Sequence, residues 1–246
     1  MSFFDRNMRF LFIVGCGHSG TGLMLAIFAN CRNVHAITNE TEFLFKSSIK
    51  EFKRKFDTLE NTSAILVAEK TPRHVYRLGK ITSDEQSSAL VMLRNPIDVV
   101  ASLKKRGFPL IDCIRRYRHD NNAWLKYQSK KKVKILKYEE LVTKTEEVLE
   151  NLGQEYGLNL ISANEKRLTD ERLYFTNRGP VQIKQTDGKG RQKHNSLRNF
   201  QIRQEIKNMN GQWKERLTDK ELRIVIEELN YHIKLFKYEE CFDYKI

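Results

Sequence analysis

The fold is decided near the N-terminus by the stretch Phe10-Leu-Phe-Ile-Val14-Gly15-Cys16-Gly17-His18-Ser19-Gly20-Thr21-Gly22. Its apolar run Phe10–Val14 predicts a strand buried on both faces, and the apolar residues up to Ala29 predict a helix directly after the glycines. Glycines at such a turn let several backbone N–H groups point inward, and a helix N-terminus adds about half a positive charge there. The stretch therefore predicts an anion-binding loop made of residues 15–22.

The spacing of this loop is that of a nucleotide-binding P-loop with one departure. Gly15 and Gly20 are separated by four residues, but Thr21 follows Gly20 at once, so the lysine of the ATPase motif is missing. That lysine neutralises the transferring phosphoryl group in kinases and hydrolases. Its absence argues against an ordinary ATPase or GTPase.

The rest of the chain alternates short apolar runs with longer amphipathic stretches, which is typical of a parallel sheet flanked by helices. We expect one α/β domain over residues 1–246, with its core in about 9–200 and C-terminal helices in about 201–246. A basic segment with glycines, Thr186–Arg198, is predicted to be a loop. The predicted strands are Phe10–Val14, Val34–Thr38, Ala64–Glu69, Ala89–Leu93 and Val133–Leu136. The predicted helices include Thr21–Ala29, Pro96–Lys105, Pro109–Ser129, Glu139–Tyr156, Gln201–Arg216 and Asp219–Leu229.

Composition narrows the classes of partner and compartment. Forty-four Lys and Arg against 31 Asp and Glu give a formal net charge of +13, which predicts an anionic partner. A hydrophobic content of 40% excludes a disordered polyelectrolyte. The four cysteines are scattered and predict reduced thiols rather than a disulfide framework or a zinc site. No apolar run reaches membrane-spanning length, so we expect a cytoplasmic protein without a membrane span.

A second predicted strand is followed directly by a predicted helix, as in the first segment. Arg94 follows the predicted strand Ala89–Leu93, and Asn95-Pro96 has the residue types of an N-cap and a first helical position. Ser102 lies farther along the same helix. A guanidinium and a hydroxyl near a helix N-terminus can hold a phosphate, with the arginine binding two oxygens at once. Two phosphate sites on neighbouring strands indicate a nucleotide that carries phosphates at both ends of its ribose.

At these residues the chain resembles the sulfotransferases that use 3′-phosphoadenosine 5′-phosphosulfate (PAPS) as donor and release adenosine 3′,5′-bisphosphate (PAP). The loop Gly15–Gly22 resembles their 5′-phosphosulfate loop, and Arg94 with Ser102 resembles their 3′-phosphate element. The resemblance covers roughly residues 9–200 and favours the carbohydrate (heparan-type glycan) branch. Supporting matches are Asn39–Phe43, Glu69–Pro72, Lys137–Leu141 and a late basic loop that contains Lys189, Gly190 and Arg191, which closes over the nucleotide in the family.

The resemblance also implies roles in catalysis. Glu40 matches the catalytic base of the glycan branch, and Glu42 is its competitor, two residues on and pointing the opposite way in an extended segment. Lys70 is expected to position the sulfuryl oxygens or the acceptor. At position 18 the family usually carries Lys or Arg, whereas this chain has His18, which could act as an imidazolium or as a weaker neutral donor. Lys70 and Arg73 are the alternative sources of the missing charge.

We therefore expect sulfuryl transfer from PAPS to a hydroxyl of a carbohydrate acceptor, without a metal and without a nucleic-acid partner. The acceptor's identity and the oligomeric state stay open. Two alternatives remain: a P-loop kinase or hydrolase, and a non-enzymatic polyanion-binding protein that uses the net positive charge. Neither alternative explains both phosphate elements.

Overall fold

The computed structural model describes residues 8–56, 63–172, 174–176, 183–186 and 190–239. In this part of the chain five strands form one sheet in the order β2-β3-β1-β4-β5, and every neighbouring pair is parallel. The strands are β1 (Arg9–Gly15), β2 (Val34–Ile37), β3 (Leu66–Lys70), β4 (Ser87–Leu93) and β5 (Val133–Lys137). The predicted α/β fold with a parallel sheet flanked by helices is confirmed, and each predicted strand is present within two residues at either end.

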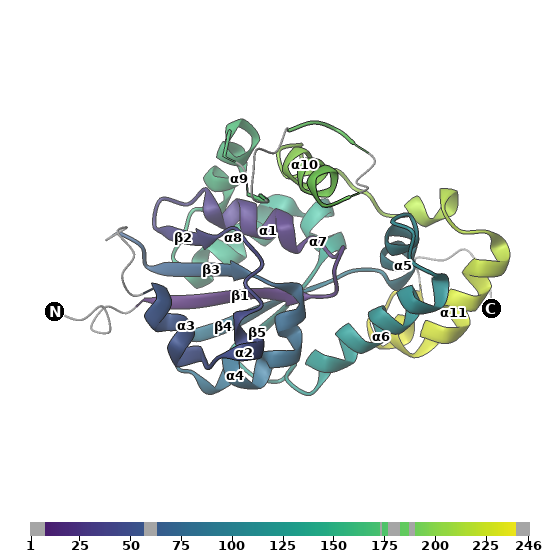
Figure 1. Cartoon of the computed structure of the whole chain (residues 1–246), viewed down its shortest axis with the longest axis horizontal. Helices are drawn as coiled ribbons and strands as arrows, with labels where there is room; N and C mark the ends of the chain where they lie inside the picture. The colour runs from purple at the N-terminus through teal and green to yellow at the C-terminus, as the bar shows by residue number, and fades with distance from the viewer. Residues whose placement is uncertain (1–7, 57–62, 173, 177–182, 187–189, 240–246) are drawn as a thin grey trace.

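The helices lie on both faces of the sheet and at its carboxyl edge (Figure 1). One face is covered by α1, α8 and α9, and the other by α3 and α4. The helices are α1 (Thr21–Ala29), α2 (Phe43–Lys46), α3 (Ile49–Phe56), α4 (Leu78–Ser83), α5 (Pro96–Lys104), α6 (Leu110–Leu125), α7 (Tyr138–Thr143), α8 (Thr145–Tyr156), α9 (Leu160–Thr169), α10 (Arg191–Gln201) and α11 (Asp219–Leu235), with 3₁₀ turns η2 (Pro72–Arg77) and η3 (Gln212–Glu215).

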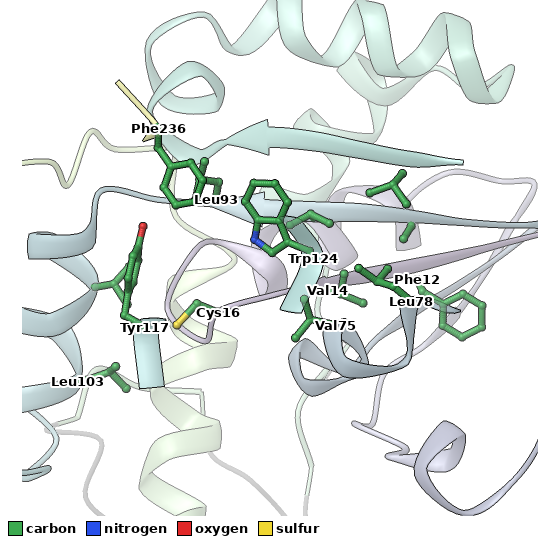
Figure 2. Close-up of a cluster of buried hydrophobic side chains, with 14 of the residues drawn as sticks. Phe12, Val14, Cys16, Val75, Leu78, Leu93, Leu103, Tyr117, Trp124 and Phe236 are labelled. Atoms are coloured by element: carbon green, nitrogen blue, oxygen red, sulfur yellow. The ribbon is translucent and has the colours of Figure 1, made fainter. Parts of the chain in front are cut away.

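The central strand β1 is apolar throughout because both of its faces are buried. Phe12 and Val14 belong to a hydrophobic cluster that includes residues of α3, α4, α5, α6 and α11, whereas Leu11 and Ile13 belong to the cluster beneath α1, α8 and α9. Figure 2 shows part of the first cluster, with Phe12, Val14 and Trp124 among its labelled side chains. Successive side chains of a strand point to opposite faces, so a continuous apolar run is what this central position requires.

The carboxyl ends of β1, β3 and β4 meet at one edge of the sheet because these strands are parallel neighbours. In open α/β sheets, ligands bind outside this edge. α5 starts there as the sequence predicts, with Asn95 as N-cap: its Oδ1 accepts from Ile97 N at 2.9 Å, and Pro96 occupies the first turn. The fold therefore brings the two predicted phosphate elements to the same edge.

Three expectations about helices are wrong. The predicted helix Glu139–Tyr156 is divided into α7 and α8 at Lys144, whose ψ of 45° departs from helical values. The predicted loop Thr186–Arg198 contains the first turns of α10 from Arg191 onward.

The predicted helix Gln201–Arg216 is largely an extended and turning segment that contains η3. Its carbonyl groups bind arginines from elsewhere instead of forming helical bonds: Ile202 O and Gln204 O accept from Arg167, and Met209 O accepts from Arg94. Gly211 adds a left-handed residue with φ 81°. Long-range partners outweighed the local helical pattern here, because they satisfy the same backbone groups.

Two further findings concern the described part of the chain. No helix in it is both long enough and apolar enough to span a membrane. Cys16, Cys31 and Cys113 are free thiols, and Cys241 lies outside the described residues.

Candidate active site

The loop between β1 and α1 depends on glycines at two positions. Gly15 has φ 128°, and a Cβ there would lie 2.4 Å from the carbonyl oxygen of Met92 on β4. Gly20 has φ 90°, and a Cβ there would lie 2.9 Å from the Tyr138 ring at the start of α7. Both positions combine a left-handed backbone with a lack of space, so only glycine fits without rearrangement. The loop consequently packs tightly between β4 and α7.

Polar groups of this loop are left without protein partners. α1 begins at Thr21 with no side-chain cap and no acidic residue in its first turn. Its first N–H groups and their positive field are therefore not neutralised by a cap. The side chain of Ser19 is fully buried, and its Oγ has no hydrogen-bond partner among the described residues. Such orphaned buried atoms are rare in native proteins, and both features fit a loop that binds an anion.

Arg94 and Ser102 both contact this loop. Nη1 of Arg94 donates to the His18 carbonyl oxygen at 3.1 Å, and its guanidinium lies 4.3 Å from the centroid of the Tyr138 ring. Oγ of Ser102, on α5, lies 2.8 Å from His18 Nδ1. Nε of Arg94 is buried and has no partner in the described part of the chain. The structure thus brings the two predicted phosphate elements together and leaves a guanidinium donor unused.

The segment before η3 approaches Arg94 from another direction. Met209 O accepts from Arg94 Nη2 at 3.0 Å, and Gly211 N donates to Asp98 Oδ2 at 3.1 Å. Arg216 lies near enough to Arg94 to feel its charge: burial lowers the pKa of Arg216, and the charge of Arg94 lowers it further. Sequence reasoning missed this second cation beside Arg94, since it placed the residue in a helix of its own.

His18 brings no charge to the loop in the free protein. Burial lowers its pKa well below the ordinary value, and the positive charges of Arg106, Arg116 and Arg198 lower it further. The imidazole is therefore neutral at neutral pH, which favours the weaker neutral donor over the imidazolium. Its backbone is left-handed, with φ 73°.

Glu40 and Lys70 form an ion pair at the end of β3. Lys70 is 2% exposed, its Nζ contacts the Glu40 carboxylate, and Arg198 Nη1 lies 3.3 Å from the same carboxylate oxygen. Burial raises the pKa of Glu40, but the two cations outweigh burial and lower it overall. Burial and the charge of Arg198 lower the pKa of Lys70 to about 8, although Glu40 opposes the shift. Glu40 is thus an ionised carboxylate, held by two cations.

Glu42, the competing candidate base, points to a different partner. It precedes α2 in a left-handed conformation with φ 48°, and its Oε1 lies 3.1 Å from Arg73 Nη1. Both side chains of this pair are more than half exposed. Arg73, one of the alternative loop cations, is thereby engaged at the surface, whereas Lys70 lies with Glu40.

A buried carboxylate holds the segment that carries Glu40. Glu69 is 1% exposed and lies 3.1 Å from His74 Nδ1, while His74 Nε2 accepts from Leu44 N, so Nδ1 is the donor. Oε1 of Glu69 also accepts from the hydroxyl groups of Thr41 and Thr71. This network fixes the chain directly after Glu40 against the end of β3.

The late basic segment contributes different residues from those predicted. Lys189 lies outside the described residues, and Gly190 and Arg191 are exposed at the start of α10. One and two turns later, His194 contacts Arg106, and Arg198 contacts Glu40. Residues four apart share a helix face, which explains why these two reach the site together.

Two more arginines of the site are not among its predicted residues. Arg106 follows α5 in a basic run that reads as a solvated surface, and Arg116 lies on α6. Nη2 of Arg116 lies 2.9 Å from the position that a Cβ on Gly17 would take. No sequence signal separates Arg116 from its neighbour Arg115. Within the described residues no group of three or more His, Cys, Asp or Glu side chains is placed to hold a metal ion.

No family model and no curated protein matches the chain by sequence. Solved structures do match. Mouse sulfotransferase SULT7A1 complexed with PAP is 12% identical with a TM-score of 0.59, over 96% of this chain and 87% of that one. The sulfotransferase domain from the curacin biosynthetic pathway is 15% identical with a TM-score of 0.58, over 92% and 99%. The sulfotransferase domain from the Synechococcus PCC 7002 olefin synthase is 14% identical with a TM-score of 0.56, over 92% and 96%.

At such identities the likeness concerns the fold, and these three structures do not single out a carbohydrate branch. It extends over 92% to 96% of this chain. Together with the parallel sheet and its glycine loop, these comparisons establish that the chain has the sulfotransferase fold.

Proposed function

We propose that this protein is a sulfotransferase that moves the sulfuryl group of PAPS to a hydroxyl. The observation that supports this most is the meeting of Arg94 and Ser102 with the loop between β1 and α1. A ligand with one phosphate needs one such element, whereas PAPS carries anionic groups on both sides of its ribose.

The residues fit the two ends of this donor. The loop Gly15–Gly22 would bind the 5′-phosphosulfate through its backbone N–H groups and the orphaned Ser19 hydroxyl. Arg94, with its unused Nε, and Ser102 would bind the 3′-phosphate after exchanging their contacts with His18. Charge-assisted hydrogen bonds from a guanidinium to a phosphate are strong enough to drive that exchange.

Glu40 is the proposed general base. Its carboxylate is ionised, so it can accept the proton of the acceptor hydroxyl as the new oxygen–sulfur bond forms. The bond between sulfur and the bridging oxygen breaks, and its electron pair leaves with PAP. Lys70, paired with Glu40, would orient the sulfuryl oxygens.

For the acceptor we propose a carbohydrate hydroxyl. The support is the glycan-type pattern around Glu40 and the cations that surround it, which suit a saccharide carrying carboxylate, phosphate or sulfate groups. A phenol or a lipid hydroxyl would use the same donor site.

Donor binding is tested by thermal shift. PAP should raise the melting temperature far more than AMP or ADP, by mass action on the folded state. Arg94→Ala should remove most of this preference, whereas Arg73→Ala, which removes a surface arginine, should keep it. Stabilisation by magnesium-ATP but not by PAP would instead support a kinase. Salt-sensitive binding of DNA or RNA without saturable nucleotide binding would support a polyanion-binding protein.

Transfer is tested with sulfate-labelled PAPS and a panel of saccharides, phenols and lipids. Glu40→Gln should bind PAP as the wild type does and lose transfer. Glu42→Gln should keep transfer, because Glu42 is paired with Arg73 away from Lys70. If the two variants exchange these phenotypes, Glu42 is the base.

A further inference from the structure

The loop Gly15–Gly22 contains no lysine or arginine, and the surrounding structure supplies a cation. His18 is hydrogen-bonded to Ser102, and its imidazole is neutral. Sulfuryl transfer places negative charge on the leaving 5′-phosphate, which needs a fixed positive group close by. That group must therefore come from outside the loop.

Arg116 is the cation that packs against the loop itself. Its Nη2 lies 2.9 Å from where a Cβ on Gly17 would be, so the guanidinium occupies the space that any side chain at position 17 would need. Gly17 has no positive φ, in contrast to Gly15 and Gly20. At this position glycine is therefore needed for space rather than for backbone conformation.

A buried carboxylate orients Arg116 toward the loop. Nε of Arg116 lies 3.7 Å from Oδ2 of Asp120, one turn farther along α6. The other carboxylate oxygen of Asp120 accepts from the hydroxyl of Tyr76 at 2.5 Å, and Asp120 is 4% exposed. The Arg116 side chain itself is 40% exposed, so one side of the guanidinium stays open to a ligand.

Two more arginines add positive field at the same place. Arg106 contacts His194 and Arg198 contacts Glu40, and the positive charges of both act on His18 in the loop. Burial lowers the pKa of Arg106 to about 10, with further contributions from the charges of Arg198 and Arg116. Lys70 and Arg198 contact Glu40, and Arg116 pairs with Asp120. The positive groups Lys70, Arg106, Arg116 and Arg198 favour an anionic ligand at this place.

We propose that Arg116 is a catalytic residue that contacts the 5′-phosphosulfate and stabilises the leaving phosphate in place of a loop lysine, assisted by Arg106 and Arg198. This role rests on the proposed function and extends it, because it assigns the missing charge to a helix about a hundred residues from the loop.

The test compares two ligands that differ only in the 5′-phosphate. Isothermal titration calorimetry measures the affinity of PAP and of adenosine 3′-monophosphate for wild type, Arg116→Ala, Arg116→Lys and Arg115→Ala. Arg115 is a matched control, because it precedes Arg116 on the same helix, is 71% exposed and pairs with Asp112. Arg116→Ala should reduce the preference for PAP by roughly tenfold to a hundredfold, as expected for charged hydrogen bonds. It should leave adenosine 3′-monophosphate binding unchanged. Arg116→Lys should restore part of the preference, and Arg115→Ala should keep all of it.

Gly17→Ala provides a second, independent perturbation. Its new methyl group displaces the end of a flexible side chain and introduces no backbone strain, so the melting temperature should stay near that of the wild type. The variant should show the same selective loss for PAP as Arg116→Ala. A wild type that prefers PAP, with both variants retaining that preference, overturns the role of Arg116 and leaves the proposed function standing. A wild type that binds neither nucleotide overturns both.

Discussion

The buried ammonium group of Lys70 destabilises the free protein, and this cost should become smaller as the pH rises. Lys70 has a pKa of about 8 in the folded chain, against 10.5 for an ordinary lysine, because burial and Arg198 disfavour its charge more than Glu40 favours it. Below pH 8 the folded and unfolded chains both hold the proton, so the full penalty is present. Between pH 8 and 10.5 the unfolded chain binds more protons than the folded one, and the penalty is relieved.

The expected size follows from these two values. Integrating the difference in bound protons from pH 7 to pH 9.5 gives Lys70 a gain of about 2 kcal/mol in the free energy of unfolding, which appears as the difference between the wild type and Lys70→Met. Urea unfolding at the two pH values, followed by circular dichroism, measures it. Lys70→Met should lose this gain, because methionine fills the same space without a titrating group. Lys130→Met removes an exposed lysine and should keep it.

The result that would refute the reasoning is a wild type and a Lys70→Met variant with parallel pH dependence. In that case Lys70 is no more difficult to charge in the fold than in the unfolded chain. Saturating PAP should flatten the wild-type rise if its anionic groups lie near Lys70, because a nearby anion favours the ammonium form.

Three other perturbations follow from the site. Gly15→Ala should destabilise the protein by several kcal/mol in urea unfolding, because its Cβ meets the Met92 carbonyl oxygen at 2.4 Å with φ 128°. The new methyl group of Gly22→Ala meets a movable Phe175 ring at 3.2 Å, so this substitution should cost much less stability. Equal effects of the two substitutions would contradict this account of the loop. His18→Lys should leave the single-turnover rate of transfer nearly unchanged, because the surrounding arginines already supply the positive charge, and a clearly faster rate would show that the loop is undercharged. Glu69→Gln should lower the free energy of unfolding by about 2 kcal/mol, since an amide cannot accept from every donor that the carboxylate satisfies. It should also loosen the segment after Glu40 and so reduce kcat more than PAP affinity. A loss of stability with kcat unchanged would limit Glu69 to a structural role.

Prediction from sequence succeeded where the relevant contacts are local. The N-cap Asn95 contacts Ile97, two residues on, and the apolar run of β1 and the left-handed glycines are recognisable from residue type and order alone, so these patterns indicate their structure. Prediction failed for residues 201–216, where the amphipathic pattern favoured a helix. Arg167 and Arg94 take the carbonyl groups of that segment, and these partners lie far away in sequence.

The sequence by itself determined the class of fold, and it predicted the glycine loop after β1 and the two residues, Arg94 and Ser102, that contact this loop. It favoured Glu40 over Glu42 through the family resemblance, but it could not distinguish Arg116 from Arg115, because residues of one type have the same local signal. The tertiary structure pairs Glu40 with Lys70 and Arg198 and turns Arg116 toward Gly17. The electrostatic field at such a site depends on all charged groups that the fold brings within a few ångströms, and the separation of these residues in the sequence does not reveal their distance in space.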